Sequence, residues 1–402
     1  MKSKNYLDVI FLEEPIIKRK IALMVNPQHK DDFIERTNHF KLRTTLILRD
    51  VQWVLDEQVV PENAFNPHSN RWTYIHTLED IYKWLNGTAV NHTGITKFEA
   101  IGKSAEDRDI YAFSIINPLK DDSVKVIIEA GTHGNEYIGT HFTTYLINQL
   151  LNSTDPNLVM LRKKYNWYFI PVLNPDGYVY SQKEDRLWRK NRRRTEGKSI
   201  GVDLNRNFGY KFGLYDASSE PEHERYHGPS EFSEPETQVL RKFIDRKRDR
   251  LTFYFSFHGY GQKIIIPYSD STRHLGNFHE VQTYAKQAAA KMESFAGHKY
   301  SVGIPFDLFG KRQSGDSASW VKKDYHVPYV FTVLLRDDGS YALALPNEQL
   351  LAACQEMEIG FVELMMSTPR NMKGNTFFTR ARGIRISVLP FLFIILPMLI
   401  MV

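Results

Sequence analysis

Three side chains in this sequence have the types and spacing that can hold a catalytic zinc ion. His133 and Glu136 lie in the segment His133-Gly134-Asn135-Glu136, and His258 follows far downstream. Such a site commonly takes three protein ligands and keeps a fourth position for water or substrate. A His-x-x-Glu pair in a turn after a strand can direct both side chains at one ion. The pattern therefore predicts one Zn²⁺ bound by His133, Glu136 and His258, and the competing interpretation of His258 is an ordinary histidine at a strand end.

Six short segments around these residues occur in one order along the chain. Together they resemble the zinc metallocarboxypeptidases of the pancreatic A/B type, from about residue 71 to residue 367. Residues 20–60 resemble part of that family's inhibitory pro-segment. The six segments are Gly131-Thr132-His133-Gly134-Asn135-Glu136, Asn174-Pro175-Asp176-Gly177-Tyr178, Arg186-Leu187-Trp188-Arg189-Lys190, Gly201-Val202-Asp203-Leu204-Asn205-Arg206-Asn207, Phe232-Ser233-Glu234-Pro235-Glu236-Thr237 and Phe257-His258-Gly259-Tyr260.

The resemblance implies roles for three polar residues beside the metal. Arg189 would polarise the scissile carbonyl and stabilise the oxyanion that forms there, a preorganised electrostatic contribution. Asn205 and Arg206 would hold the terminal carboxylate of a peptide, because a planar guanidinium can donate two parallel hydrogen bonds to it. The expected partners are therefore peptide and protein C-termini, and the expected reaction is hydrolysis of the terminal peptide bond.

Three further residues are expected to contact the substrate. Tyr260 would line a neighbouring subsite, and Asn135 stands where the pancreatic-type enzymes have a substrate-contacting arginine. Ala318 would line the pocket for the terminal side chain, where alanine favours apolar over basic residues. The nearby carboxyl group of Asp316 leaves this side-chain preference open.

The expected catalytic base is missing. Leu334 stands where the family has a glutamate, which takes a proton from the attacking water and passes it to the leaving amine. Such acid–base help is worth roughly 10²–10⁴-fold in rate, or about 3–5 kcal/mol of barrier. The family's mobile tyrosine is absent too, since its position falls on Gly310 or Lys311. Two descriptions stay open: a carboxypeptidase with impaired catalysis, and a non-catalytic zinc-containing peptide-binding protein at a membrane surface. Asp338 is a candidate substitute base if the strand of Leu334 continues to it.

Strand and helix patterns alternate around these residues, which predicts a layered α/β domain. The resemblance implies three layers with a twisted mixed sheet between helices, preceded by a small, truncated α+β pro-segment. Strands are expected at 124–129, 167–172, 251–257, 264–266 and 328–335, and helices at 137–151 and 349–366. In the pro-segment we expect strands at 21–25 and 44–48 and helices at 30–39 and 49–57.

The chain is predicted to have three parts: a partial pro-segment with a linker (1–66), the carboxypeptidase-like domain (67–370), and a polar spacer with a hydrophobic tail (371–402). Residues 388–402 are all apolar or proline, a run shorter than the ~20 residues of a membrane span. A GPI-attachment signal, a short tail anchor and a buried terminal helix are the open interpretations. The first two imply the secretory pathway and a cell-surface or extracellular location. Residues 1–20 show no secretory signal, so we expect the N-terminus of this sequence to be incomplete.

The charge and cysteine content of the chain limit which binding partners and cross-links can be expected. The net charge is +5, and much of the excess lies in the basic run at 186–194. No zinc-finger, RRM-like or helix-turn-helix signature accompanies that run, so we expect no nucleic-acid partner, and we expect a monomer. Cys354 is the only cysteine, so no intramolecular disulfide can form. Its place on the apolar face of the last predicted helix indicates a buried free thiol.

Overall fold

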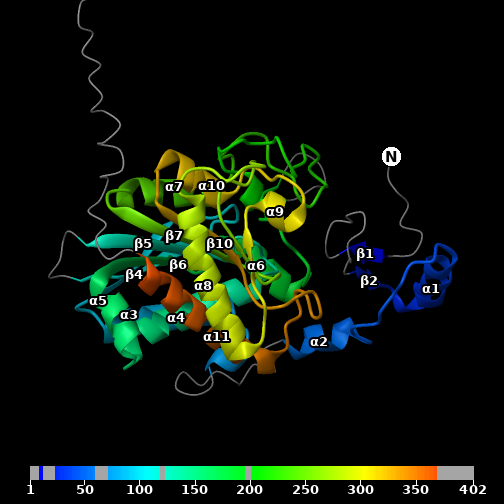
Figure 1. Cartoon of the computed structure of the whole chain (residues 1–402), viewed down its shortest axis with the longest axis horizontal. Coiled ribbons are helices and arrows are strands. Elements are labelled where there is room, and N and C mark those ends of the chain that lie inside the picture. Colours follow the sequence, from blue (N-terminus) through cyan, green and yellow to red (C-terminus); the bar gives the residue numbers. More distant parts are fainter. Residues whose placement is uncertain (1–8, 12–22, 59–70, 118–122, 195–200, 369–402) are drawn as a thin grey trace, which may run out of the picture. The chain divides into compact units, whose positions relative to one another are not determined.

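A mixed β-sheet of eight strands forms the centre of the part of the chain that the structure describes (Figure 1). The computed structural model describes residues 9–11, 23–58, 71–117, 123–194 and 201–368. In spatial order the strands are β3 (Thr96–Lys103), β4 (Asp109–Ile115), β6 (Tyr165–Ile170), β5 (Val124–Ala130), β7 (Leu251–His258), β10 (Tyr329–Leu334), β8 (Lys263–Ile265) and β9 (Ser301–Gly303).

The centre of this sheet is parallel and its flanks contain the antiparallel pairs. Strands β6, β5, β7 and β10 run parallel to one another, as do β8 and β9. The pairs β3/β4, β4/β6 and β10/β8 are antiparallel. Every residue of β6 and β7 is buried, which agrees with the nearly continuous apolar runs expected of strands covered on both faces. The predicted mixed sheet between helices is therefore confirmed.

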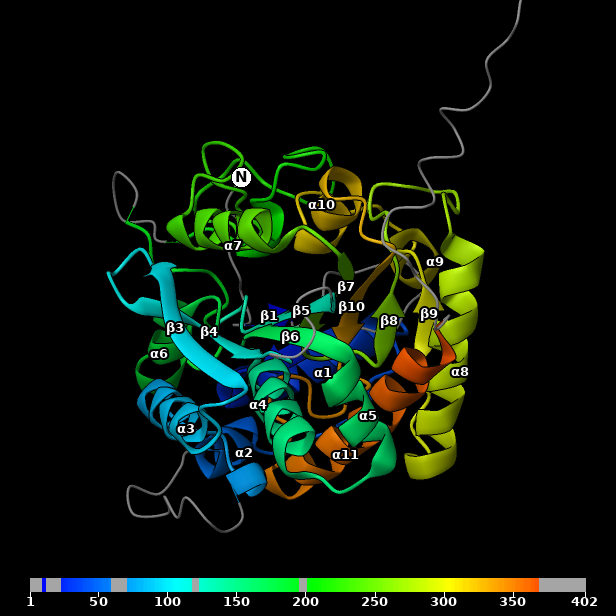
Figure 2. The same cartoon turned by 90° about the vertical axis from the view of Figure 1, so that its left-hand side faces the viewer.

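Helices cover both faces of the sheet. Figure 2 shows α7 (Pro235–Lys247) and α10 (Ser317–Asp324) on one side, with α4 (Tyr137–Asn152), α5 (Pro156–Lys164) and α11 (Asn347–Ser367) on the other. The long helix α8 (Phe278–Ala296) packs against α11. The remaining helices of the domain are α3 (Leu78–Asn91), α6 (Pro175–Lys183), α9 (Pro305–Phe309) and the 3₁₀ turns η2 (Arg71–Thr73) and η3 (Leu204–Arg206).

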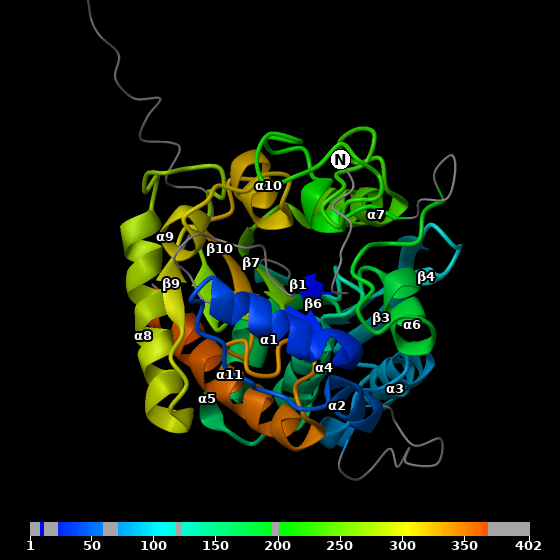
Figure 3. The ribbon, with the colours of Figure 1, turned by 90° about the vertical axis from the view of Figure 1, so that its right-hand side faces the viewer.

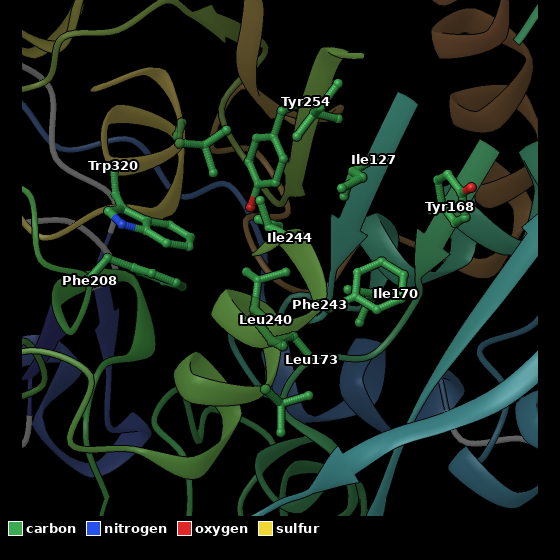
Figure 4. Packing of buried hydrophobic residues seen from close by; sticks show 14 of the residues in the cluster. Ile127, Tyr168, Ile170, Leu173, Phe208, Leu240, Phe243, Ile244, Tyr254 and Trp320 are labelled. Atoms are coloured by element: carbon green, nitrogen blue, oxygen red, sulfur yellow. The ribbon is translucent and has the colours of Figure 1, made fainter. Parts of the chain in front are cut away.

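An apolar core fills the space between the sheet and the α7/α10 layer. Ile127 of β5 and Tyr254 of β7 are register partners and face the same side. They belong to one buried cluster with Leu240 and Phe243 of α7 and with Trp320 of α10 (Figure 4). This packing holds the ends of β5 and β7 next to each other, because displacing either strand would expose large apolar side chains whose burial is worth about 1.5–3 kcal/mol each.

A second core of aromatic rings lies on the opposite face. Phe255 of β7 and Phe361 of α11 have ring centroids 5.1 Å apart, and Phe142 of α4 lies 4.8 Å from Phe257 of β7. Edge-to-face and tilted contacts of this kind are favourable geometries for aromatic pairs. Strand β7 is thereby held between α4 and α11, immediately before His258.

The final helix α11 and its cysteine follow the prediction. The helix covers Asn347–Ser367, close to the expected 349–366, and Cys354 is fully buried as a free thiol. Burial raises the pKa of that thiol well above its ordinary value, so the group is an inert part of the core. Among the described residues, no helix combines the length and apolar character needed to cross a membrane.

The described N-terminal residues form short elements, drawn in blue in Figure 3. Strand β1 (Val9–Phe11) pairs antiparallel with β2 (Leu23–Val25), followed by η1 (Pro27–His29), α1 (Lys30–His39) and α2 (Val51–Glu57). The helix at 30–39 is confirmed, and α2 begins after its N-cap Asp50, whose side chain accepts from Trp53 N.

The predicted strand at 44–48 is wrong. That segment has irregular backbone, with Leu46 60% and Ile47 56% exposed. β-branched residues favour a strand only where a partner strand or a packing surface completes it, and here the propensity alone does not suffice. The predicted linker and the C-terminal tail at 388–402 lie outside the described residues, as do 371–387.

Candidate active site

Two neighbouring strands bring the predicted metal ligands together. Strands β5 and β7 are parallel, with Ala130 in register with Phe257, so their carboxyl ends meet at one edge of the sheet. The loop after β5 carries His133, and Glu136 is the N-cap of α4. His258 is the last residue of β7. Strand order therefore places three residues from distant parts of the sequence at a single point.

The three side chains converge closely enough to share one ion. Their candidate ligand atoms all lie within 4.8 Å of one another, and the residues are 2%, 8% and 2% exposed for His133, Glu136 and His258. The Nδ1 atoms of the two imidazoles are 3.2 Å apart. The Glu136 carboxylate lies 2.8 Å from His133 Nδ1 and 2.7 Å from His258 Nδ1.

This donor set fits zinc. Two imidazole nitrogens and one carboxylate are ligands that Zn²⁺ prefers, and a three-residue set is typical of sites that keep a fourth position open. Burial opposes a charge on Glu136, but the two adjacent imidazoles outweigh it and hold the pKa of Glu136 well below its ordinary value. The carboxylate is thus ionised and ready to bind a cation.

Outer hydrogen bonds fix the orientation of both imidazole rings. His133 Nε2 lies 3.1 Å from Asp203 Oδ1, and His258 Nε2 lies 2.8 Å from Ser256 Oγ. Such contacts direct the opposite ring nitrogen towards a metal and raise its basicity. Asp203 belongs to one of the six segments, but sequence reasoning assigned it no role. Its position two residues before Asn205 was the signal that could have pointed to it.

Arg189 lies at the rim of the metal-ligand group. Its Nη1 donates to Glu136 Oε1 at 3.0 Å and its Nη2 donates to Asp203 Oδ2 at 3.2 Å. Burial opposes a charge on Asp203, but Arg189 and His133 hold the pKa of that carboxyl well below its ordinary value. The side chain of Arg189 is 24% exposed, so the cation lies beside the ligands and reaches the solvent side of the site.

The close approach of α4 to β7 depends on a glycine. A Cβ atom added to Gly139 would lie 2.5 Å from Phe257 O and 3.0 Å from Phe257 C. Both neighbours are backbone atoms and cannot move aside cheaply. Because Glu136 caps α4 and His258 follows Phe257, this contact sets the distance between two of the three ligands.

The predicted carboxylate clamp forms a second group, joined to the first through Asp203. Asn205 N donates to Asp203 Oδ1 at 3.0 Å, and Asn205 Oδ1 accepts from Ser317 N, the first residue of α10, at 3.2 Å. Arg206 is buried, at 4% exposure. Its guanidinium donates to the carbonyl and carboxylate of Asp216, a residue that the sequence motifs did not single out.

Leu334 ends β10 beside the metal ligands. It is in register with His258 of β7 and with Lys263 of β8, so its half-buried side chain shares a face with both. Its Cδ1 would lie 3.0 Å from a Cβ on Gly261. The position beside His258 is therefore filled by an alkyl group, and leucine carries no atom that accepts a proton.

Strand alternation does not bring Asp338, the candidate substitute base, to the face of Leu334. Strand β10 ends at Leu334, and the chain turns, so the alternation does not reach Asp338. That residue is exposed, and its carboxylate accepts hydrogen bonds from Ser340 N and Oγ. Arg336, two residues after Leu334, pairs with the buried Glu356 of α11.

The remaining predicted residues lie around these groups. Asn135 is 5% exposed and its Nδ2 donates to Leu187 O at 2.7 Å. Tyr260 is half-buried just after His258. Ala318 of α10 is buried in the same apolar cluster as Trp320. Asp316, the N-cap of α10, accepts hydrogen bonds from Ser319 N and Ser269 Oγ. Of the two candidates for the tyrosine position, Gly310 caps α9 at φ 72° and Lys311 supplies a side chain.

Comparisons with known proteins agree with this geometry. The sequence matches the family model described as zinc carboxypeptidase over residues 81–359. It is 32% identical to carboxypeptidase O of Bos taurus, over 76% of this chain and 81% of that protein. It is 30% identical to carboxypeptidase A2 of Mus musculus, over 91% and 88%. The crystal structure of thrombin activatable fibrinolysis inhibitor superposes with a TM-score of 0.86 at 25% identity, covering 90% of this chain and 92% of that one.

Proposed function

This chain belongs to the zinc carboxypeptidase family, and on that premise we propose that it binds the carboxyl ends of peptides at one zinc site and hydrolyses the terminal peptide bond only weakly. The observation that carries the weak hydrolysis is the register of Leu334 with His258. An alkyl side chain occupies the place beside the metal ligands where a proton acceptor is needed.

The residues divide into a metal group and a binding group. His133, Glu136 and His258 would hold Zn²⁺, which when bound would act as a Lewis acid towards the scissile carbonyl and its attacking water. Arg189 lies 3.0 Å from a ligand oxygen, a position from which its guanidinium can stabilise negative charge that develops on the carbonyl oxygen. Asn205 and Arg206 would hold the terminal carboxylate, which restricts binding to chain ends.

Proton transfer is the step that this site lacks. The attacking water must lose a proton and the leaving amine must gain one, and Leu334 can do neither. Removing such help costs roughly 10²–10⁴-fold in rate. Asp338 is exposed and bonded to Ser340, so it supports no relay at this place.

A non-catalytic binding protein is the second candidate. The same alkyl group at position 334 favours it, since the ligand set and the carboxylate clamp are retained while the proton-transfer group is gone. Under this description the site would recognise C-termini without turnover. We also propose, from the sequence alone, that 67–370 form the carboxypeptidase domain, that 1–66 form a pro-segment and linker, and that 371–402 form a polar spacer with a hydrophobic tail for membrane attachment.

Restoring the glutamate tests the proposal. Full-length protein is loaded with zinc, its zinc content is measured, and hydrolysis of N-blocked dipeptides is followed for wild type, Leu334→Glu and the isosteric control Leu334→Gln. A third variant, Leu334→Glu with Lys263→Leu, is needed because Lys263 is the cross-strand partner of position 334. An ammonium there would stabilise the new carboxylate and lower its basicity.

We expect Leu334→Glu, alone or with Lys263→Leu, to raise kcat about 10²–10⁴-fold while Leu334→Gln stays at the wild-type rate. A wild-type kcat already in the ordinary range of about 1–10³ s⁻¹ would rule out impaired catalysis. If neither glutamate variant gains activity, the missing base is not the main defect. Failure to take up one zinc per chain would contradict both candidate functions.

A further inference from the structure

Asp216 lies at the meeting point of three cationic side chains. Its carboxylate is 2.8 Å from Arg206 Nη2, 2.8 Å from Arg225 Nη1 and 2.9 Å from Lys311 Nζ. The Asp216 side chain is 5% exposed, as is that of Arg206, whereas Arg225 and Lys311 are 23% and 26% exposed. The buried carboxylate therefore draws two partly exposed cations towards the buried guanidinium of the clamp.

Asp216 occupies one edge of the Arg206 guanidinium. The Asp216 carbonyl accepts from Nε at 2.7 Å and its carboxylate accepts from Nη2, while Nη1 donates to Asn205 O at 2.9 Å. A guanidinium has five N–H donors. Among the described residues these three contacts use three of them, which leaves one donor on each Nη nitrogen. Two donors match the two oxygens of a peptide's terminal carboxylate.

Lys311 lies beside this guanidinium for a local reason. Helix α9 ends at Gly310, whose φ of 72° suits glycine, and the chain reverses so that the next residue reaches Asp216. Its ammonium bonds Asp216 Oδ1 while Arg206 bonds Oδ2. The two cations are thus held on the two oxygens of one carboxylate.

The cluster needs Asp216 because its cations repel one another. Two like charges held a few Å apart repel each other, and the repulsion is stronger where water is excluded. Asp216 has a φ of 49°, a left-handed conformation that aspartate tolerates better than most residues. Its carbonyl and carboxylate both bind Arg206 in that conformation, so backbone and side chain act together to fix the guanidinium.

We propose that Lys311 is a second carboxylate-binding residue and that Asp216 is the positioning residue that holds Lys311 and Arg206 side by side. The terminal carboxylate of a peptide then binds between an ammonium and a guanidinium. This inference rests on the proposed function, because it concerns the same carboxylate clamp.

The test compares an N-blocked dipeptide with its C-terminal amide, which lacks the carboxylate charge. Dissociation constants of both are measured by calorimetry on the zinc-loaded full chain for wild type, Arg206→Met, Lys311→Met, Lys311→Arg and Asp216→Asn. The control is Arg312→Gln. Arg312 is the next residue after Lys311, and its guanidinium stacks 3.8 Å from the Tyr215 ring, so this variant removes a neighbouring charge outside the cluster. Thermal unfolding verifies that each variant is folded.

We expect Lys311→Met to weaken binding of the acid about 10- to 100-fold, as for loss of one charge-assisted hydrogen bond, with little change for the amide. Lys311→Arg should retain most of the preference for the acid, Asp216→Asn should reduce it, and Arg312→Gln should change it less than about threefold. Loss of preference in Arg206→Met but not in Lys311→Met would overturn the role of Lys311. Tighter acid binding in Asp216→Asn would show that Asp216 competes with the peptide. A wild type that does not prefer the acid would refute the proposed function itself.

Discussion

Asp203 serves both halves of the site with one buried carboxylate. Its Oδ1 accepts from Asn205 N and lies near His133 Nε2, and its Oδ2 accepts from Arg189. The group is fully buried, so each of these contacts replaces water that the carboxylate has lost. The orientation of the candidate metal ligand His133 and that of the predicted carboxylate clamp therefore depend on the same side chain.

Replacing Asp203 by asparagine should weaken zinc binding about 10- to 100-fold, the usual effect of losing a ligand-orienting partner. The amide keeps the size of the side chain but removes the charge that His133 and Arg189 face. The dissociation constant of zinc is measured by competition with a chromophoric chelator. Glu184→Gln, at an exposed position, is the control, and equal zinc affinity in Asp203→Asn and wild type would contradict the orienting role.

Site residues could be predicted from the sequence where a local motif and the end of a strand together fix their position. His133, Glu136 and His258 each follow a recognisable apolar strand, so adjacency in the sheet completes the group. Asp216 lies outside the six segments, and only the folded chain brings Arg225 and Lys311 to it. Asp338 lies beyond Leu334, the last residue of β10, so strand alternation does not place it on the face of Leu334.

At the scale of elements, α4 and β7 lie so close together that a methyl group added at Gly139 would force them apart. Gly139 touches the backbone of Phe257, and the two elements carry Glu136 and His258 at their ends. The aromatic contacts of Phe142 and Phe361 press the same strand against α4 and α11. The helix therefore cannot shift to relieve a clash without disturbing a packed core.

Gly139→Ala should destabilise the protein by about 1–3 kcal/mol, the usual cost of overpacking, and should also weaken zinc binding. Chemical denaturation and zinc titration give the two quantities. Gly87→Ala in α3 is the matched control, because a Cβ there meets nothing within 4 Å. That change should be neutral or stabilising by up to about 1 kcal/mol. Similar behaviour of the two variants would show that the α4–β7 contact is not tight.

Several elements were predicted closely, the buried strands from their apolar runs and α1 from its polar helical pattern. Helix α1 has the predicted bounds, and β5, β7 and β10 lie within about two residues of theirs. The sequence predicted no order of the strands in the sheet, because apolar runs do not specify which neighbours they pair with. The segment at 44–48 shows the converse, since strand propensity without a partner produced no strand.

At the scale of the whole molecule, one buried carboxyl group links stability to pH. Glu236 of α7 is fully buried, accepting from Ala105 N at 2.9 Å and from Asn191 Nδ2 at 3.0 Å. Burial raises its pKa from 4.5 to about 7. Between pH 4.5 and about 7, the Glu236 carboxyl group is therefore protonated in the folded state and ionised in the unfolded state. Its contribution to stability is present below pH 4.5 and is lost as pH rises through about 7.

Glu236→Gln should remove this dependence. As pH rises from 5 to 8, wild type should lose on the order of 3 kcal/mol of unfolding free energy relative to the variant, because the glutamine stays uncharged throughout. The free energy of unfolding is measured in urea at both pH values, with Glu231→Gln as a control for loss of an exposed carboxylate. Parallel pH profiles of wild type and Glu236→Gln would disprove the link.

The Asp216 cluster also joins three segments of the chain by ion pairs, which should couple their motions. One carboxylate ties together the residues after η3, the segment of Arg225 and the turn after α9. If the segment of Asp216 moves out, Arg225 and Lys311 lose the carboxylate that offsets their repulsion from Arg206, so opening of that segment should loosen the other two in a single cooperative event. A peptide seated in the clamp would stabilise that unit as a whole, and its departure would be governed by the lifetime of the closed unit, not by the fraying of one loop.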